Sequence, residues 1–249
     1  MRGFWLAILT TFSLSLAQGL LLESDLVQTF ELRPGEEARG AVRLRNAGKT
    51  PLTVSLSLGD YREGEGFMGL GEAPRSLGPQ GIALETDRVT LLPGESRDVG
   101  FRVRFPAGLS GTRYAAILVA PEAEAREEPG EGARVGLRVV QRYAVLVLAS
   151  YGGEAQVVFT VGQGGEGRSS LEAENLGGSR FYYPRVGYQV VGPGGVVAQG
   201  ELGTFLFLPG EPKRLSLALP PLSPGEYQAV LFLDDGYKAY AVRAPFSLR

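Results

Sequence analysis

Apolar and polar residues alternate along many short stretches of the chain from Leu20 onward, so that one face of each stretch is apolar and the other polar. Pro-Gly or other Gly-rich turns end these stretches. The clearest examples are residues 41–45, 53–58, 99–105 and 215–219. The best helical window, 122–131, lacks an apolar face and contains Pro129 and Gly130. The pattern therefore predicts an all-β protein.

Two halves of the sequence contain the same turn signals in the same order. Each half has an Asn-x-Gly turn, a Leu-Pro-Gly-Glu turn, and a bend with Pro and Gly that leads into a strand opening with Tyr. These signals lie at 46–48, 92–95 and 106–114, and again at 175–177, 208–211 and 220–227. A further Pro-Gly-Glu turn, 33–36, comes before the first round. Pro presets one turn position and Gly provides the positive φ at the next, so the flanking strands can pair antiparallel.

Each half thus has about seven short strands, which is typical of an immunoglobulin-like sandwich without its disulfide. We expect two tandem immunoglobulin-like β-sandwich domains, with a boundary near Tyr151. The expected divisions are a signal peptide at 1–17, an N-terminal domain at 18–150 and a C-terminal domain at 151–249. A single large jelly roll is the alternative, and the repeated order of turns argues against it.

The N-terminus predicts export. Arg2 gives positive charge, residues 4–16 are mostly apolar, and Ser15 and Ala17 are small residues at the cleavage-determining positions. The alternative is a membrane anchor, but about 13 apolar residues are fewer than the roughly 20 that a spanning helix needs. We expect cleavage after Ala17 and a protein that is periplasmic or otherwise extracytoplasmic, and soluble.

Composition removes many kinds of chemistry. The 249 residues include 44% hydrophobic and 21% charged residues with a net charge of −2, which disfavours both disorder and nucleic-acid binding. Histidine and cysteine are both absent, so no Ser-His-Asp or Cys-His triad and no His or Cys zinc site can form. We expect no enzyme activity, no cofactor, no metal site and no small-molecule substrate. Few Asn residues and more Arg than Lys favour thermostability, although genomic base composition could produce the same bias.

Two short motifs resemble chemical sites only superficially. The sequence Asp234-Asp235-Gly236 lies between two apolar stretches, and Asp-Gly in that position is a hairpin signal. The Gly-rich stretch 162–167 does not lead into a helix, so a flexible hairpin end is the better interpretation than a nucleotide-binding loop.

A long acidic segment, 122–134, leads directly into the longest strand pattern of the chain, 135–149. A strand that is longer than its neighbours is expected to lie partly at a sheet edge, with backbone groups available to a partner. Val135, Leu137 and Val139 share one face, which suits β-strand addition, where alternate side chains fill a partner's pockets. The alternative is an ordinary last strand buried within the first domain.

The stretch 89–95, which ends in Pro-Gly-Glu, and the strand sequence 111–121 resemble corresponding segments of the periplasmic pilus-assembly chaperones. The resemblance spans most of the chain after the signal peptide and is strongest over 82–148. It implies two immunoglobulin-like domains and donor-strand complementation, in which one strand lends alternate apolar side chains to an incomplete pilin fold. The same sequence features are also similar to immunoglobulin-like domains of bacterial surface proteins.

The resemblance also implies roles for individual residues. Val135 and Leu137, with the small Ala133 before them, occupy the donor positions. A family Lys that binds the terminal carboxylate of the subunit corresponds in spacing to Arg142, which is expected at the hinge between the domains. The second family anchor is an Arg in the first strand, where this sequence has Phe30.

The sequence therefore predicts an exported, non-enzymatic chaperone-like binding protein for pilus or surface-structure assembly. Its expected partners are exported protein subunits such as pilins, with envelope association left open and no nucleic acid. The expected partner-binding residues are Ala133, Val135, Leu137, Val139 and Arg142. The alternative is a structural or adhesive envelope protein built of immunoglobulin-like modules.

Overall fold

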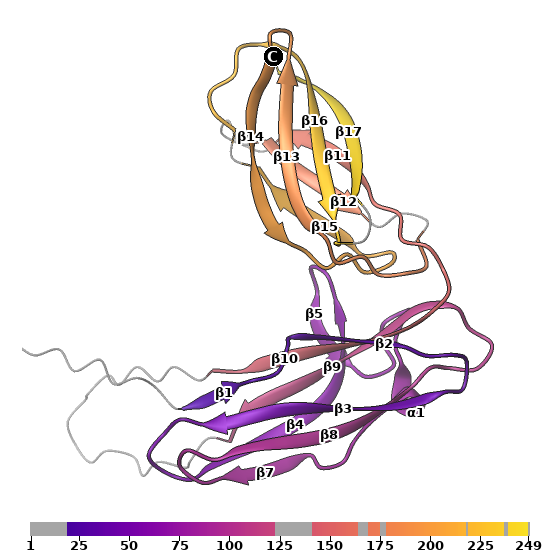
Figure 1. Cartoon of the computed structure of the whole chain (residues 1–249), viewed down its shortest axis with the longest axis vertical. Coiled ribbons are helices and arrows are strands. Elements are labelled where there is room, and N and C mark those ends of the chain that lie inside the picture. Colours follow the sequence, from indigo (N-terminus) through magenta and orange to yellow (C-terminus); the bar gives the residue numbers. More distant parts are fainter. Residues whose placement is uncertain are drawn as a thin grey trace, which may run out of the picture.

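A computed structural model describes residues 19–122, 141–163, 169–174, 178–217, 219–236 and 239–248. Almost all of its regular structure is β, which confirms the predicted fold class of two tandem immunoglobulin-like sandwiches. The described helix, α1 (Gly78–Gly81), is a single turn. The two sandwiches are set at a steep angle to each other, so the molecule has the shape of an L (Figure 1).

The first sandwich consists of two sheets with strand orders β1-β3-β8-β6 and β2-β10-β9-β4-β5, with β7 also paired to β4. Its strands are β1 (Leu20–Leu22), β2 (Val27–Glu31), β3 (Glu37–Asn46), β4 (Leu52–Arg62), β5 (Gly66–Gly69), β6 (Ile82–Leu84), β7 (Arg88–Leu91), β8 (Ser96–Arg104), β9 (Gly111–Pro121) and β10 (Tyr143–Tyr151).

The core of the first sandwich follows from the period-two alternation. Inward-facing residues of the two sheets are fully buried, including Val42 and Phe101 from one sheet and Ile117 and Val147 from the other. Burying one such side chain contributes about 1.5–3 kcal/mol. The alternation that predicted strands at 41–45 and 99–105 therefore also identifies which residues form this core.

The second sandwich pairs its strands in the orders β11-β12-β15 and β14-β13-β16-β17. Its strands are β11 (Val158–Gln163), β12 (Ser169–Glu174), β13 (Arg185–Gly192), β14 (Gly195–Thr204), β15 (Pro212–Ser216), β16 (Gly225–Asp234) and β17 (Ala239–Leu248). Phe207 and Leu231 are among its fully buried core residues. Strands β16 and β17 form the hairpin predicted from Asp-Gly, and Gly236 N donates to Asp234 Oδ1 at 2.8 Å.

The three Pro-Gly-Glu turns share one backbone geometry. In each, the Glu N–H donates to the carbonyl oxygen three residues earlier, at 2.9 Å for Glu36 and Glu95 and 3.2 Å for Glu211. The turn glycines have φ near +80°: +82° for Gly35, +77° for Gly94 and +73° for Gly210. Only glycine adopts this φ without strain, which is why the motif predicts the turn.

Candidate functional site

Strand β10 has different neighbours along its two halves. On one side it pairs antiparallel with β9 over its whole length, from Tyr143 to Tyr151. On the other side it pairs in parallel with β2, which begins opposite Leu146. No described strand pairs with that second side of residues 143–145. The described part of the chain therefore contains an open strand edge at the start of β10.

The predicted long strand over 135–149 is only partly matched by the structure. The strand begins at Tyr143 and ends at Tyr151, and Gln141 and Arg142 are described but do not belong to it. Residues 123–140 lie outside the described residues, so the predicted donor residues Ala133, Val135, Leu137 and Val139 are outside them too. Their roles stay predictions.

Arg142 was expected at the hinge, and this expectation is wrong. The chain passes from Tyr151, at the other end of β10, into the second sandwich. Arg142 comes just before the first residue of β10. It is nine residues from Tyr151 at the hinge end, roughly 30 Å at about 3.3 Å per residue. It is exposed at the opposite end of the strand. The prediction failed because the spacing from Leu137 does not specify which end of β10 meets the second domain.

Phe30 also does not form an anchor with Arg142. It lies in β2 opposite Ala149, and its ring packs edge to face on Phe101, with centroids 6.0 Å apart. It is a partly buried residue packed against the first core. The two positions that the resemblance aligns with the family's carboxylate anchors are thus at different ends of β10.

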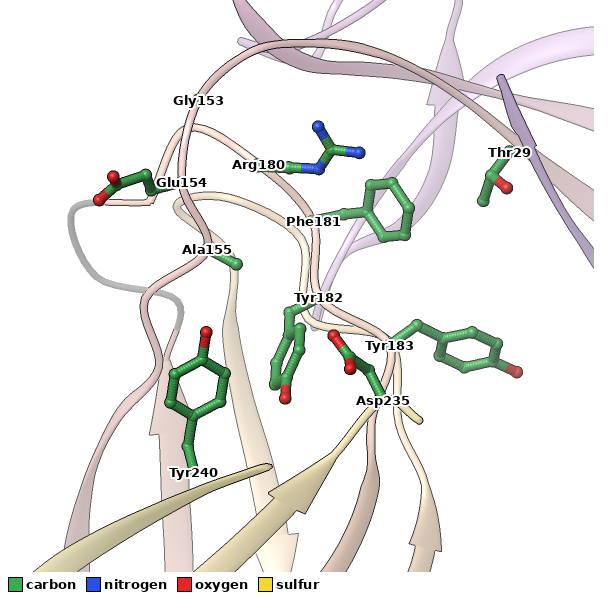
Figure 2. Close-up of a pocket in the computed structure, with 10 residues that line it drawn as sticks. All are labelled: Thr29, Gly153, Glu154, Ala155, Arg180, Phe181, Tyr182, Tyr183, Asp235 and Tyr240. Carbon is green, nitrogen blue, oxygen red and sulfur yellow. The ribbon is translucent and has the colours of Figure 1, made fainter. Parts of the chain in front are cut away.

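Two pockets follow β2 from the open edge to the junction of the sandwiches. The first has a volume of about 690 Å³ and lies beside the start of β10. It is lined by Leu22, Ser24, Asp25, Leu26, Val27, Tyr143 and Tyr183. The second, of about 780 Å³, lies between the two sandwiches and is drawn in Figure 2. Its lining residues are Thr29, Gly153, Glu154, Ala155, Arg180, Phe181, Tyr182, Tyr183, Asp235 and Tyr240.

Tyr183 lines both pockets, and β2 contributes Val27 to the first and Thr29 to the second. The two pockets are therefore neighbours along β2, with Tyr183 beside both, and together they are called the groove. The aromatic side of the groove was not predicted from the sequence. Its signal was the run Phe181-Tyr182-Tyr183, which is followed by Pro184 and stands outside any alternating stretch.

Polar contacts hold the two sandwiches together near the connecting chain. Thr112 and Ser150 are buried and hydrogen bond to each other at 2.8 Å. Thr112 N donates to the Ser179 carbonyl oxygen at 2.7 Å, and Phe181 N donates to Thr112 Oγ1 at 3.0 Å. A Cβ on Gly111 would lie 2.2 Å from the same Ser179 oxygen, and Gly111 has φ +86°, so this contact requires glycine.

A second contact is made by the β4–β5 hairpin, which reaches toward the second sandwich in Figure 1. Glu211 accepts hydrogen bonds from Tyr114 Oη at 3.2 Å and from Glu63 N at 3.3 Å, and it is only 8% exposed. Lys213 forms an ion pair with Glu63 at 3.1 Å. Burial, and then the charge of Glu211, raise the pKa of the Tyr114 phenol. These groups fix the angle between the sandwiches, and with it the groove.

An apolar cluster lies between the two polar contacts. Tyr114, Leu148 and Leu208 are buried in it, and Phe181 packs against it. It joins β9 and β10 of the first sandwich to the second sandwich. The junction is therefore a packed interface with polar contacts on each side of it.

The described residues contain no helix long and apolar enough to cross a membrane. Within the same residues there is no group of three or more acidic side chains placed to hold a metal ion.

Comparison with known proteins gives matches in structure only. The sequence matches no model of a known protein family and no curated protein. The structure is similar to that of the YadV chaperone, with a TM-score of 0.51 and 11% identity over 92% of this chain and 100% of that chain. The two chains therefore share their architecture over almost their whole length.

A second similar chain comes from the pre-assembly complex of CsuC with the tip adhesion subunit CsuE, from archaic chaperone-usher Csu pili of Acinetobacter baumannii. Its TM-score is 0.52, at 14% identity over 90% of this chain and 97% of that one. This protein has the fold of pilus-assembly chaperones. The resemblance noted in the sequence is thus confirmed for the fold. The class 5 fimbriae chaperone CfaA has the same fold, with a TM-score of 0.50 and 9% identity over 90% of this chain and 98% of that chain.

Proposed function

We propose that this protein is an exported, non-enzymatic chaperone for subunits of pili or another surface structure, and that it acts by β-strand addition. Its chaperone fold supports the proposal, since two of the similar chains are named as chaperones and the third comes from a chaperone–subunit complex. The observation that carries the mechanism is the open edge at residues 143–145 of β10. Exposed strand edges are templates for pairing with another chain.

The proposed mechanism extends this edge toward the N-terminus. Tyr143 and Val145 face the core of the first sandwich, and Ala144 lies on the other side of the strand. Odd-numbered residues of a continuing strand would keep the same side, because side chains alternate with period two. Ala133, Val135, Leu137 and Val139 are odd-numbered, so they would together present small and apolar side chains to a partner's groove.

Binding along this edge would protect the partner as well as hold it. A subunit that lacks a strand exposes apolar surface and unpaired backbone groups, and both promote aggregation. Strand addition pairs the backbone groups and covers the apolar surface until the subunit is assembled. The predicted signal peptide at 1–17 would place this event in the periplasm or elsewhere outside the cytoplasm.

The decisive experiment is capture of partners by the tagged protein from an envelope extract of its own cells, identified by mass spectrometry. We expect small exported subunits at about one-to-one ratio with the wild-type protein. Leu137→Glu would place a charge in the apolar groove of the partner and is expected to abolish capture. Val140→Glu introduces the same charge at an even-numbered position and is the matched control, with capture retained.

Unchanged capture by a folded Leu137→Glu protein would remove the strand from the mechanism. Recovery of cell-wall or outer-membrane components alone would contradict the chaperone function and favour a structural envelope protein.

A further inference from the structure

The side of the interdomain pocket that belongs to the second sandwich is aromatic. Tyr182 and Tyr240 stand edge to face, with ring centroids 5.8 Å apart and ring planes at 77°. Tyr182 is almost completely buried, and its hydroxyl donates to the Leu233 carbonyl oxygen at 3.3 Å, which holds the ring in place. Tyr240 and Tyr183 are 47% and 44% exposed. The pocket thus combines one fixed ring with two accessible ones.

Negative charge lies next to these rings. Figure 2 shows Asp235 between Tyr182 and Tyr183, with its carboxylate turned toward the Tyr182 ring. Burial, followed by the charge of Asp235, raises the pKa of Tyr182, so the carboxylate is within electrostatic reach of the ring. Among the described residues that line the pocket the basic one is Arg180, which forms an ion pair with Glu31 of the first sandwich. The field beside the rings therefore favours a cation.

Aromatic faces and a carboxylate together are the groups that recognise a basic side chain. Ring quadrupoles attract ammonium and guanidinium groups, and a carboxylate can accept two parallel hydrogen bonds from a guanidinium. We propose that the interdomain pocket binds a basic side chain of the partner, an arginine or a lysine, against the exposed Tyr240 ring and beside Tyr182 and Asp235. An incoming carboxylate would instead meet Asp235, while Arg180 already neutralises Glu31.

A partner bound at the open edge of β10 would lie close to the aromatic pocket. A segment paired to the open edge of β10 would lie beside the first pocket, and Tyr183 and β2 connect this pocket to the aromatic one. This inference rests on the proposed function, since the basic side chain belongs to the captured partner. It adds that the partner is selected by charge as well as by the shape of its apolar groove.

The test uses isothermal titration calorimetry of the full protein with N-acetyl-arginine methylamide as the probe. The neutral near-isostere N-acetyl-citrulline methylamide and the acidic N-acetyl-glutamate methylamide serve as comparisons. We expect weak binding of the arginine probe and at least about tenfold weaker binding of the other two. Equal binding of the arginine and citrulline probes, or tighter binding of the glutamate probe, would overturn the proposal.

Variants separate the contributions of ring and charge. Asp235→Asn and Tyr240→Ala are each expected to weaken binding of the arginine probe about tenfold, whereas Tyr240→Phe keeps a ring and stays within about twofold. Glu201→Gln removes the same charge from exposed β14 and is the matched control for Asp235→Asn, with no change expected. Far-UV circular dichroism checks that each variant is folded. Unchanged binding in folded Asp235→Asn would contradict the proposal.

The failure of this inference is distinguishable from failure of the proposed function. If Leu137→Glu still captures partners while the arginine probe binds as expected, strand addition fails and the cation site stands. If Leu137→Glu blocks capture and the probe does not distinguish arginine from citrulline, strand addition stands and the cation site fails.

Discussion

Three turns with the same Pro-Gly-Glu sequence use their glutamate in two different ways. In the first sandwich, Glu36 and Glu95 turn back on their own turn and accept hydrogen bonds from the backbone N–H groups of Arg33 and Leu92, at 2.8 and 2.7 Å. In the second sandwich, Glu211 instead accepts from Tyr114 and Glu63 of the first sandwich.

This difference shows that a local motif fixes the backbone but not the partner of its side chain. The glutamate N–H closes each of the three turns in the same way. The side chain caps the turn where the turn faces solvent, and it binds the other sandwich where the turn is buried at the junction. The third copy therefore sets the angle between the sandwiches, while the first two copies act only within the first sandwich.

The substitution Glu211→Ala is expected to have the largest effect on stability and on the angle between the sandwiches. This change leaves the buried Tyr114 hydroxyl without its acceptor, which costs about 2 kcal/mol of unfolding free energy. Urea unfolding followed by tyrosine fluorescence measures this loss, and small-angle X-ray scattering should show a wider spread of domain angles. Glu36→Ala is the matched change in a turn that faces solvent and should leave the scattering curve unchanged. Equal scattering of the two variants would contradict the difference drawn between the turns.

Tyr114→Phe tests the same contact from the other side, with a smaller expected effect. It keeps the buried ring and removes only the hydroxyl, while Glu211 retains the hydrogen bond from Glu63 N. We expect a loss of about 1 kcal/mol in urea unfolding. A loss as large as that of Glu211→Ala would mean that the Glu63 contact contributes nothing.

Alkaline pH should weaken the junction progressively. Burial, and then the hydrogen bond to Glu63, raise the pKa of Tyr61 from 10.0 to about 12. Above pH 10 the unfolded chain loses this proton while the folded protein keeps it, so stability falls as pH rises from about 10 to 12. Tyr61→Phe should make the decline less steep in thermal unfolding across that range. An identical pH dependence in the variant would contradict this assignment.

The smallest expected effect on stability is that of removing the Glu95 carboxylate. A hydrogen bond from the Leu92 backbone, followed by one from Arg97, lowers the pKa of Glu95 below its ordinary value of 4.5. Its contribution to stability is complete above that value and is lost as pH falls through the lowered pKa. Glu95→Gln should reduce the acid sensitivity of unfolding slightly without altering the scattering curve. A change in the angle between the sandwiches would contradict the conclusion that the Glu95 turn acts only within the first sandwich.

Much of the fold followed from the sequence because its signals are local. Period-two alternation identified the strands and cores, and Asp-Gly identified the β16–β17 hairpin. The junction could not be predicted in this way, since Tyr114 and Glu211 are 97 positions apart and nothing local links them. The same limit explains the error at Arg142, whose place depends on which end of β10 meets the second sandwich.

The parallel pairing of β2 with β10 has a consequence for how the protein itself folds. Val27 pairs with Leu146, and β10 is the only described partner strand of β2. In a chain made from its N-terminus onward, β3 to β9 are therefore all synthesised before β2 can pair. Contacts so distant along the chain slow folding, because a long loop must close first. Until then β2 is unpaired, so the protein itself passes through a state with an incomplete sheet. We propose that it corrects the same condition in its partners.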